Sequence, residues 1–287
     1  EVMTQWVSAW IEETGLRRVL VAGGVFMNVK ASKMICELPM LESFAAFPSC
    51  GDESLPFGAC YLAAAADRLT PKPLAHAYLG PDLGLEECRA AVADVGDRVE
   101  VERPEQMAER VAQLLAAGEI VARAAGPMEF GARALGSRSI LADPINQDVV
   151  RVINRMIKKR DFWMPFAPVV RRRDAAQYFR NPKDLPSPYM MNTFDSTEKR
   201  SDFMAAVHNA DLTARPQLLE DGQNPGYEAI LERFAARTGR HVLLNTSFNL
   251  HGEPVVCGAA DAVRVLLTSG LRHLILGDLL VSKRGAP

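Results

Sequence analysis

Apolar positions in the first seventy residues predict an alternation of helices and strands. Helical spacing predicts three helices, which cover residues 2–13, 28–38 and 55–69. The apolar face of the first helix consists of Met3, Trp6, Val7 and Trp10. Apolar runs that end in glycine or proline predict a short buried strand over residues 17–24 and a second strand over residues 43–48. The alanine-rich third helix should pack closely on its neighbours.

Three prolines interrupt this pattern in "TPKPLAHAYLGPDLG", at Pro71, Pro73 and Pro81. Proline lacks the backbone donor that a helix needs, so the third helix cannot continue through this segment. We therefore expect a domain boundary near residue 70, with one domain over residues 1–70 and another over residues 71–287.

The second domain repeats the alternation, which again predicts α/β layering. A helix and a strand are predicted on either side of Gly118, within residues 107–126. Later helices are predicted over residues 228–237 and 259–267, and later strands over residues 241–247, 273–277 and 279–283. Residues 181–203 show little periodicity and are expected to form an extended connection that flanks a site.

Composition agrees with a globular protein, because 48% of the 287 residues are hydrophobic. The net charge of −2 excludes a global field that would attract a polyanion, so any basic site must be local. Five cysteines without a CxxC pair fit reduced thiols, and no apolar run approaches the length of a membrane span. We expect a cytoplasmic protein without a membrane partner. Glu1 stands where an initiator Met would be, inside a helical pattern, which predicts a fragment.

The stretch "GPMEFGARALGSRSI", residues 126–140, spaces charged side chains between glycines and lacks the alternation of a buried strand. Glycine lets the backbone approach a ligand closely, and the planar fork of Arg133 or Arg138 suits phosphate. The alternative is a surface turn in which these arginines pair with Glu129 and Asp143.

A basic run follows in residues 151–173, with eight basic residues against one acid. If residues 148–159 form a helix, then Arg151, Arg155 and Lys158 lie on one face and could line an anion pocket. The alternative is a solvated basic helix.

Two later clusters carry hydrogen-bonding side chains. "HNADLTARPQ" contains His208, Asp211, Thr213 and Arg215, although a histidine considered alone is more often structural than catalytic. In "LLNTSFN" a strand ends in polar side chains, and strand ends are where α/β sheets bind ligands. These side chains are Asn245, Thr246, Ser247 and Asn249. They could equally form an Asx-type turn.

Metal binding has little support from spacing, because the five histidines include no HxxxH pair. Asp52 follows a glycine turn after a predicted strand, and a lone carboxylate does not make a metal site.

Six motifs, in order, carry a family resemblance: "GGVFMN", "GDESLPFGA", "GPMEFGARALGSRSILADP", "IKKRDFWMPFAP", "DLTARPQ" and "LLNTSFN". Together they resemble the O-carbamoyltransferases that modify antibiotics and nodulation factors, over the later part of such proteins. The resemblance implies that residues 1–70 are the second half of an actin-like, ASKHA-type acceptor domain, which is incomplete here. Residues 71–287 would be a YrdC-like domain that forms carbamoyladenylate from carbamoyl phosphate and ATP with Mg²⁺.

The resemblance also implies roles for individual residues. Arg133 and Arg138 would bind phosphate groups, Lys158 and Arg160 would hold carbamoyl phosphate or the ATP phosphates, and Arg215 would complete the clamp. The polar strand end would position nucleotide or carbamoyl groups, with Asn245, Thr246, Ser247 and Asn249. In the first domain, Gly24 and Asn28 would contact the adenylate. Asp52 matches a metal-binding aspartate of the family, for an iron-type metal whose other ligands would come from the first half of that domain.

Two positions depart from the family pattern. Ser54 stands where glycine is usual, and Leu212 stands where many members have glycine, which could reshape the pocket around Arg215. The expected partner is a small-molecule hydroxyl, such as a sugar, an antibiotic or a nodulation-factor-like acceptor. The alternatives are a YrdC-like RNA-binding module, which the near-neutral charge disfavours, and an inactive scaffold fragment. The identity of the acceptor and the oligomeric state, with a homo-oligomer among the alternatives, stay open.

Overall fold

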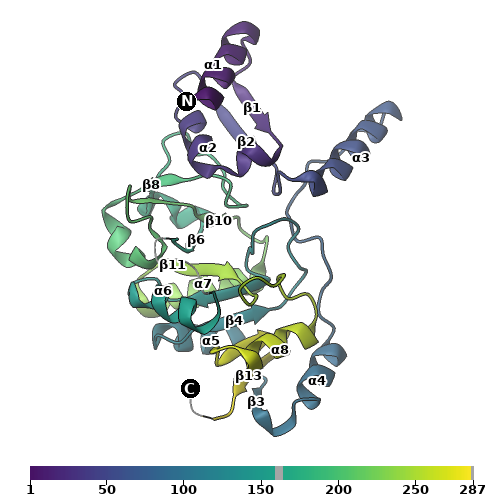
Figure 1. Ribbon diagram of the computed structural model, residues 1–287, viewed down its shortest axis with the longest axis vertical. Coiled ribbons are helices and arrows are strands. Elements are labelled where there is room, and N and C mark those ends of the chain that lie inside the picture. Colours follow the sequence, from purple (N-terminus) through teal and green to yellow (C-terminus); the bar gives the residue numbers. More distant parts are fainter. Residues whose placement is uncertain (159–163, 286–287) are drawn as a thin grey trace.

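The structure of the protein is a computed structural model that describes residues 1–158 and 164–285. It is a mixed α/β fold, which confirms the predicted class at that level. The described residues form three sheets, of two, eight and three strands. Figure 1 shows the smallest sheet at one end of the molecule and the largest sheet toward the other.

The front segment (residues 1–70) contains the two-stranded sheet. Its strands β1 (Arg18–Val21) and β2 (Ser43–Ala46) are parallel, and α1 (Val2–Thr14) and α2 (Val29–Cys36) accompany them. The predicted order of elements is confirmed. The prediction that the first strand is buried is wrong, because β1 pairs on one edge only and none of its residues is fully buried.

The third predicted helix is present as α3 (Leu55–Ala66), but the predicted close packing is wrong. None of its residues is buried, and Leu55 and Leu62 are 67% and 74% exposed. Figure 1 shows α3 projecting away from the rest of the chain. Alanine-rich sequence favours a helix through its propensity, whereas burial also needs a neighbouring surface, and the described residues cover little of this helix.

The eight-stranded sheet has the strand order β10-β6-β11-β5-β4-β12-β13-β3. In chain order its strands are β3 (Val99–Glu102), β4 (Val121–Ala124), β5 (Arg138–Ala142), β6 (Ala167–Arg171), β10 (Gln217–Leu219), β11 (Val242–Ser247), β12 (His273–Leu276) and β13 (Leu279–Lys283). The strands β4, β11 and β12 run in one direction and β5 runs in the other. The end of β4, the start of β5 and the end of β11 therefore meet at one edge of the sheet, where ligands commonly bind in such folds.

Helices cover both faces of this sheet. The pair α4 (Leu85–Ala93) and α8 (Ala259–Thr268) packs on one face, and α5 (Met107–Ala116) and α7 (Pro225–Thr238) pack on the other. Successive residues of β5 point to opposite faces, so Ile140 joins the first core and Leu141 joins the second. Burial on both sides explains why these strands are almost continuously apolar.

A three-stranded sheet joins the large sheet to the front segment. Its strands are β7 (Phe179–Arg180), β8 (Phe194–Ser196) and β9 (Thr213–Ala214). The predicted extended connection therefore contains β8. Lys33 of α2 pairs with Asp195 of β8 at 3.3 Å, and Lys183 Nζ donates to the Leu38 carbonyl at 2.5 Å. These contacts attach the front segment to the rest of the chain.

Within the described ranges, every helix is too short or too polar to cross a lipid bilayer.

Candidate functional site

The glycine loop (residues 126–137) is fixed from inside by a buried carboxylate. Oε1 of Glu129 accepts hydrogen bonds from the backbone N–H groups of Leu135 at 2.7 Å, Ser137 at 2.7 Å and Arg138 at 3.1 Å. Glu129 is 8% exposed, so the alternative of a surface pair between Glu129 and the arginines is wrong. The carboxylate instead holds the loop in one shape at the edge of the sheet.

Arg138 lies inside the protein as the first residue of β5, and its side chain is fully buried. Its three guanidinium nitrogens donate to the carbonyls of Cys257 at 3.1 Å, Gly126 at 3.0 Å and Pro81 at 3.3 Å. Burial lowers the pKa of Arg138 from its ordinary value. The stretch lacks the alternation of a buried strand, yet it ends in the buried strand β5, because backbone carbonyls satisfy the guanidinium of Arg138.

The glycine loop also contacts the front segment. The ring of Phe130 lies 4.9 Å from that of Phe57 and 6.4 Å from that of Phe47, between ring centres. Gly131 has φ +104°, and a Cβ at this position would lie 3.2 Å from the carbonyl oxygen of Pro48. Two of the six motifs, distant in sequence, are therefore adjacent in the structure.

Asp52 lies between Pro48 and Phe57 in the chain and is the exposed first residue of the short helix η2 (Asp52–Ser54). Within residues 1–158 and 164–285, no group of three or more His, Cys, Asp or Glu side chains could hold a metal ion. One carboxylate does not fit an iron-type site, and the metal role of Asp52 stays a prediction.

Asn245 connects β11 to the glycine loop. Its Nδ2 donates to the Ala134 carbonyl at 2.8 Å, next to Arg133, which is half-buried. The Oδ1 atom of Asn245 is buried and lacks a hydrogen-bond partner within the described part of the chain. Thr246, the next residue of β11, is also buried. The assignments of Asn245, Thr246 and Arg133 to ligand binding remain predictions, and Asn245 has a free acceptor for a ligand donor.

Lys158 reaches the interior through a change in helix type. The helix α6 (Asp148–Ile153) continues as a π-helical turn, η4 (Asn154–Lys158). The side chain of Lys158 is buried, whereas Arg151 and Arg155 are exposed, so the prediction that all three share a face is wrong. A π turn has more residues than an α turn and rotates the residues after it, which places Lys158 inside.

The ammonium group of Lys158 meets the polar end of β11. Its Nζ atom lies 3.0 Å from Oγ of Ser247, 2.6 Å from Oδ1 of Asn249 and 3.3 Å from the Asn249 carbonyl. Asn249 Nδ2 donates to the carbonyls of Leu250 and Glu253, which fixes the amide orientation. The structure therefore brings together three of the predicted site residues from two motifs. Arg160, a further predicted site residue, and Lys159 lie outside the described residues.

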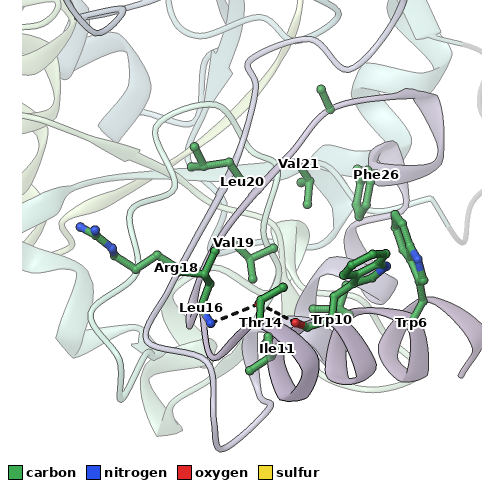
Figure 2. Close-up of a pocket in the computed structure, with 12 residues that line it drawn as sticks. Trp6, Trp10, Ile11, Thr14, Leu16, Arg18, Val19, Leu20, Val21 and Phe26 are labelled. Carbon is green, nitrogen blue, oxygen red and sulfur yellow. Dashed lines mark hydrogen bonds between the residues drawn. The ribbon is translucent and has the colours of Figure 1, made fainter.

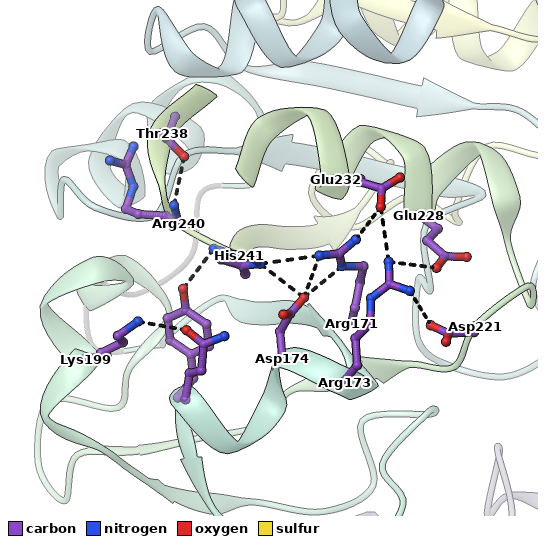
Figure 3. A network of polar contacts seen from close by, with 12 residues as sticks. Arg171, Arg173, Asp174, Lys199, Asp221, Glu228, Glu232, Thr238, Arg240 and His241 are labelled. Carbon is purple, nitrogen blue, oxygen red and sulfur yellow. Dashed lines mark hydrogen bonds and ion pairs between the residues drawn. The ribbon is translucent and has the colours of Figure 1, made fainter. Parts of the chain in front are cut away.

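Arg171 and Arg173 of the basic run belong to a separate network, shown in Figure 3. Arg171 bonds to Asp174 at 2.8 Å and to Glu232 at 3.0 Å, and Arg173 also pairs with Glu232, at 3.2 Å. His241 lies 3.2 Å from Asp174 in the same network. These positive charges are compensated by carboxylates, so the basic run does not form one continuous anion-binding surface.

Arg215 lines a cavity of about 400 Å³, which we call the Arg215 cavity. The polar residues that line it are Lys30, Thr193, His208, Thr213 and Arg215, and Phe166 lies among the apolar ones. Thr193 precedes β8 and Arg215 follows β9, and these strands pair. The Thr193 hydroxyl is buried and has no hydrogen-bond partner in the described residues. The cavity thus combines cationic side chains with an unsatisfied hydroxyl.

The front segment contributes to this cavity through the start of α2. Asn28 caps α2, with its side-chain oxygen accepting from the Ala31 N–H at 3.1 Å, and Val29 and Lys30 follow in the cavity wall. Gly24 begins the short helix η1 (Gly24–Met27) and is exposed. The structure gives Asn28 a capping role, and the predicted contacts of Gly24 and Asn28 with an adenylate stay predictions.

Residues 112–283 match the family model described as carbamoyltransferase C-terminus. The chain belongs to the carbamoyltransferase family. Both Lys158 with its partners and the Arg215 cavity wall formed by residues 164–215 lie within the matched range.

Several relatives of this chain are about twice its length. The nodulation protein NolNO of Sinorhizobium fredii is 36% identical over 281 residues, covering 96% of this chain and 41% of the relative. The 3'-hydroxymethylcephem-O-carbamoyltransferase of Amycolatopsis lactamdurans is 37% identical over 164 residues, covering 57% of this chain and 31% of the relative. The chain spans about half the length of the curated relatives it matches over nearly its whole length.

Among solved structures, full-length HypF in a phosphate- and nucleotide-bound form is similar with a TM-score of 0.42 and 14% identity. The similarity covers 69% of this chain and 26% of that one.

An apolar cavity of about 430 Å³ opens on the front segment of this carbamoyltransferase chain, and Figure 2 shows it. Trp6 and Trp10 of α1 and Leu20 of β1 line it and are 55%, 56% and 83% exposed. Scattered exposed apolar residues are normal, but contiguous ones mark an interaction surface. The sequence pattern indicated the apolar face of α1 and did not reveal that it would be uncovered.

Proposed function

We propose that this chain is the part of an O-carbamoyltransferase that forms carbamoyladenylate from carbamoyl phosphate and ATP with Mg²⁺. Water hydrolyses carbamoyl phosphate to carbamate and phosphate. A carbamate oxygen then attacks the α-phosphorus of ATP, and pyrophosphate leaves. The carbamoyl group of the adenylate is destined for the hydroxyl of a small-molecule acceptor.

The buried ammonium group of Lys158 is the observation that carries this proposal. A buried lysine is costly unless oxygen atoms surround it, and here Ser247 and Asn249 supply them. Such a charge, fixed in advance and shielded from water, stabilises negative charge that develops on transferring phosphoryl groups. Its position at the end of β11 is one where α/β sheets bind ligands.

A second cationic group supports a site for two phosphorylated substrates. Arg215 lies in a cavity that also contains Lys30 and the unsatisfied hydroxyl of Thr193. Arginine binds phosphate through two parallel hydrogen bonds, and a hydroxyl adds a donor or acceptor. We assign Lys158 to one substrate and the Arg215 cavity to the other.

Arg133 and Arg138 divide into two roles within this proposal. Arg133 is half-buried at the edge of the sheet and is assigned to phosphate. Arg138 is assigned to maintaining the glycine loop, because its three nitrogens bond to carbonyls. A metal at Asp52 has no part in this adenylation step.

The front segment is proposed to belong to the acceptor domain. Its open apolar surface, with Trp6, Trp10 and Leu20, would be covered by the remainder of that domain in a whole carbamoyltransferase. The name of the relative 3'-hydroxymethylcephem-O-carbamoyltransferase supports an acceptor with a free hydroxyl. Arg171 and Arg173 of the basic run pair with carboxylates in Figure 3, which gives the RNA-binding alternative no additional support.

Exchange of labelled pyrophosphate into ATP tests the adenylation step without requiring an acceptor. The purified chain should catalyse exchange that depends on carbamoyl phosphate, because the adenylate forms and reverts on the enzyme. A correctly folded chain that gives no exchange above the rate without carbamoyl phosphate would refute the proposal.

A further inference from the structure

Asp211 is the centre of a polar cluster at the wall of the Arg215 cavity. Its Oδ1 atom lies 3.0 Å from Nδ1 of His208 and accepts from Oγ1 of Thr213 at 2.7 Å and from the Thr213 N–H at 3.1 Å. Its Oδ2 atom pairs with Lys30 of α2. The two carboxylate oxygens therefore have separate partners, and the first is committed to holding the imidazole.

The backbone around His208 adds rigidity to this arrangement. The N–H of His208 donates to the Thr213 carbonyl at 2.8 Å, and the N–H of Leu212 donates to the His208 carbonyl at 2.8 Å. Leu212 has φ +57°, a left-handed conformation that glycine adopts at a lower energetic cost than leucine. The tight loop from His208 to Thr213 thus holds the His208 imidazole next to the Asp211 carboxylate.

The Asp211 contact determines which nitrogen of His208 is available. Within the described part of the chain, Nδ1 is the only His208 ring nitrogen with a hydrogen bond. When Nδ1 carries the proton toward Asp211, Nε2 has a free lone pair and can accept a proton. His208 lines the same cavity as Arg215 and Thr193, so a substrate bound there lies near this imidazole.

We propose that His208 is the general base that activates water for cleavage of carbamoyl phosphate and that Asp211 positions it. This inference rests on the proposed function and adds a catalytic group for its first step, the cleavage of carbamoyl phosphate. The water oxygen bonds to the carbonyl carbon, the bond from that carbon to the bridging oxygen breaks, and phosphate leaves with both bonding electrons. His208 takes one proton of the water and the other passes to the leaving phosphate, so the products are carbamate, hydrogen phosphate and protonated imidazole. Arg215 is placed to bind the phosphate group during this step.

A second histidine–aspartate pair in the described residues provides a matched comparison. His241 lies 3.2 Å from Asp174, but Nη2 of Arg171 lies 3.4 Å from the same imidazole nitrogen, and His241 does not line the Arg215 cavity. Figure 3 shows this pair inside the ion-pair network. His241 is therefore a histidine of similar local chemistry that lacks access to a substrate in this cavity.

The decisive experiment supplies carbamate directly. Pyrophosphate exchange is measured with carbamoyl phosphate or with ammonium carbamate, for the unmodified chain and for His208→Gln, Asp211→Asn and His241→Gln. His208→Gln should lose about 100-fold with carbamoyl phosphate, the scale typical of a general base, and keep its rate with carbamate. Asp211→Asn should show the same selective loss to a smaller extent, and His241→Gln should retain both rates.

Each contrary result has a definite meaning. If His208→Gln loses exchange equally with both substrates while its unfolding midpoint is unchanged, or if it keeps exchange with both, then the role in carbamoyl phosphate cleavage is overturned. If the unmodified chain exchanges with neither substrate, then the proposed adenylation fails as well. If His208→Gln unfolds, His208→Asn is tested by the same selective comparison.

Discussion

The Nζ atom of Lys158 lies 2.6 Å from Oδ1 of Asn249, although 91 residues separate them in the chain. The contact joins a π-helical turn to the end of β11 and brings two of the six sequence motifs into one site. Oxygen atoms at this distance stabilise the charged ammonium group in the interior. The same group can then transfer its interaction to an anionic substrate without first losing a full hydration shell.

Replacing Lys158 with methionine should reduce carbamoyl-phosphate-dependent pyrophosphate exchange by about 100-fold or more, because one fixed charge of this kind stabilises a transition state by roughly 3 kcal/mol. Methionine retains much of the apolar stem and removes the charge. The matched control is Lys199→Met, since Lys199 is exposed and its Nζ atom bonds to Gln177 at 2.8 Å. Exchange rates that are equal in the two variants would contradict a phosphate role for Lys158.

Helices and buried strands with regular apolar spacing were predictable in this chain. The order from α1 to β2 and the pair β12 and β13 follow from periods of 3.6 and 2 residues. β5 was not predictable, because it begins with Arg138, and only the folded chain supplies the carbonyls that satisfy this charge. The exposure of α3 was not predictable either, because it depends on tertiary contacts that the local sequence does not specify.

The candidate site was predictable in its residue types and less so in its geometry. The motifs identified Lys158, Ser247 and Asn249, which do meet. The burial of Lys158 depends on a π turn, which has no simple sequence signal. Lys30 and Thr193 were missed because they reach the Arg215 cavity only through contacts between distant segments, such as Lys30 with Asp211 at a separation of 181 residues.

Arg138 and Arg133 should respond oppositely to substitution. Arg138→Met should lower the free energy of unfolding by about 3 kcal/mol or more, because it leaves buried carbonyls without donors. The affected carbonyls include those of Gly126 and Pro81. Arg133→Ala should cost less stability than Arg138→Met, because Arg133 is only half-buried, and should lower the exchange rate about 100-fold.

Denaturant titration and pyrophosphate exchange on both variants separate these effects. Equal losses of stability in Arg133→Ala and Arg138→Met would mean that both arginines support the glycine loop. A stable Arg138→Met variant with slow exchange would instead return Arg138 to phosphate binding.

Gly136→Ala should destabilise the protein by about 3 kcal/mol, through an unfavourable backbone conformation and overlap with a buried ring. Gly136 has φ +116°, and an added Cβ would overlap the ring of Tyr227. Gly222→Ala is the control, because Gly222 has φ +78° and nothing lies within 4 Å of its added Cβ. Backbone strain alone should cost that variant about 1 kcal/mol. Similar shifts of the denaturation midpoint in both variants would show that the Tyr227 contact relaxes easily.

Cys36 should resist alkylation in the native state, because burial raises its pKa to about 12 and keeps the reactive thiolate scarce. Iodoacetamide at pH 8 should modify the exposed Cys60 and Cys257 first, and Cys36 only after unfolding, as read by peptide mass spectrometry. The folded chain holds the Cys36 proton more tightly than the unfolded chain, whose thiol has a pKa near 9.0. The stability from this difference is therefore complete below about pH 9 and is lost progressively as the pH rises toward 12. A Cys36→Ser variant that shows the same loss of stability over this range would assign the alkaline transition to another group.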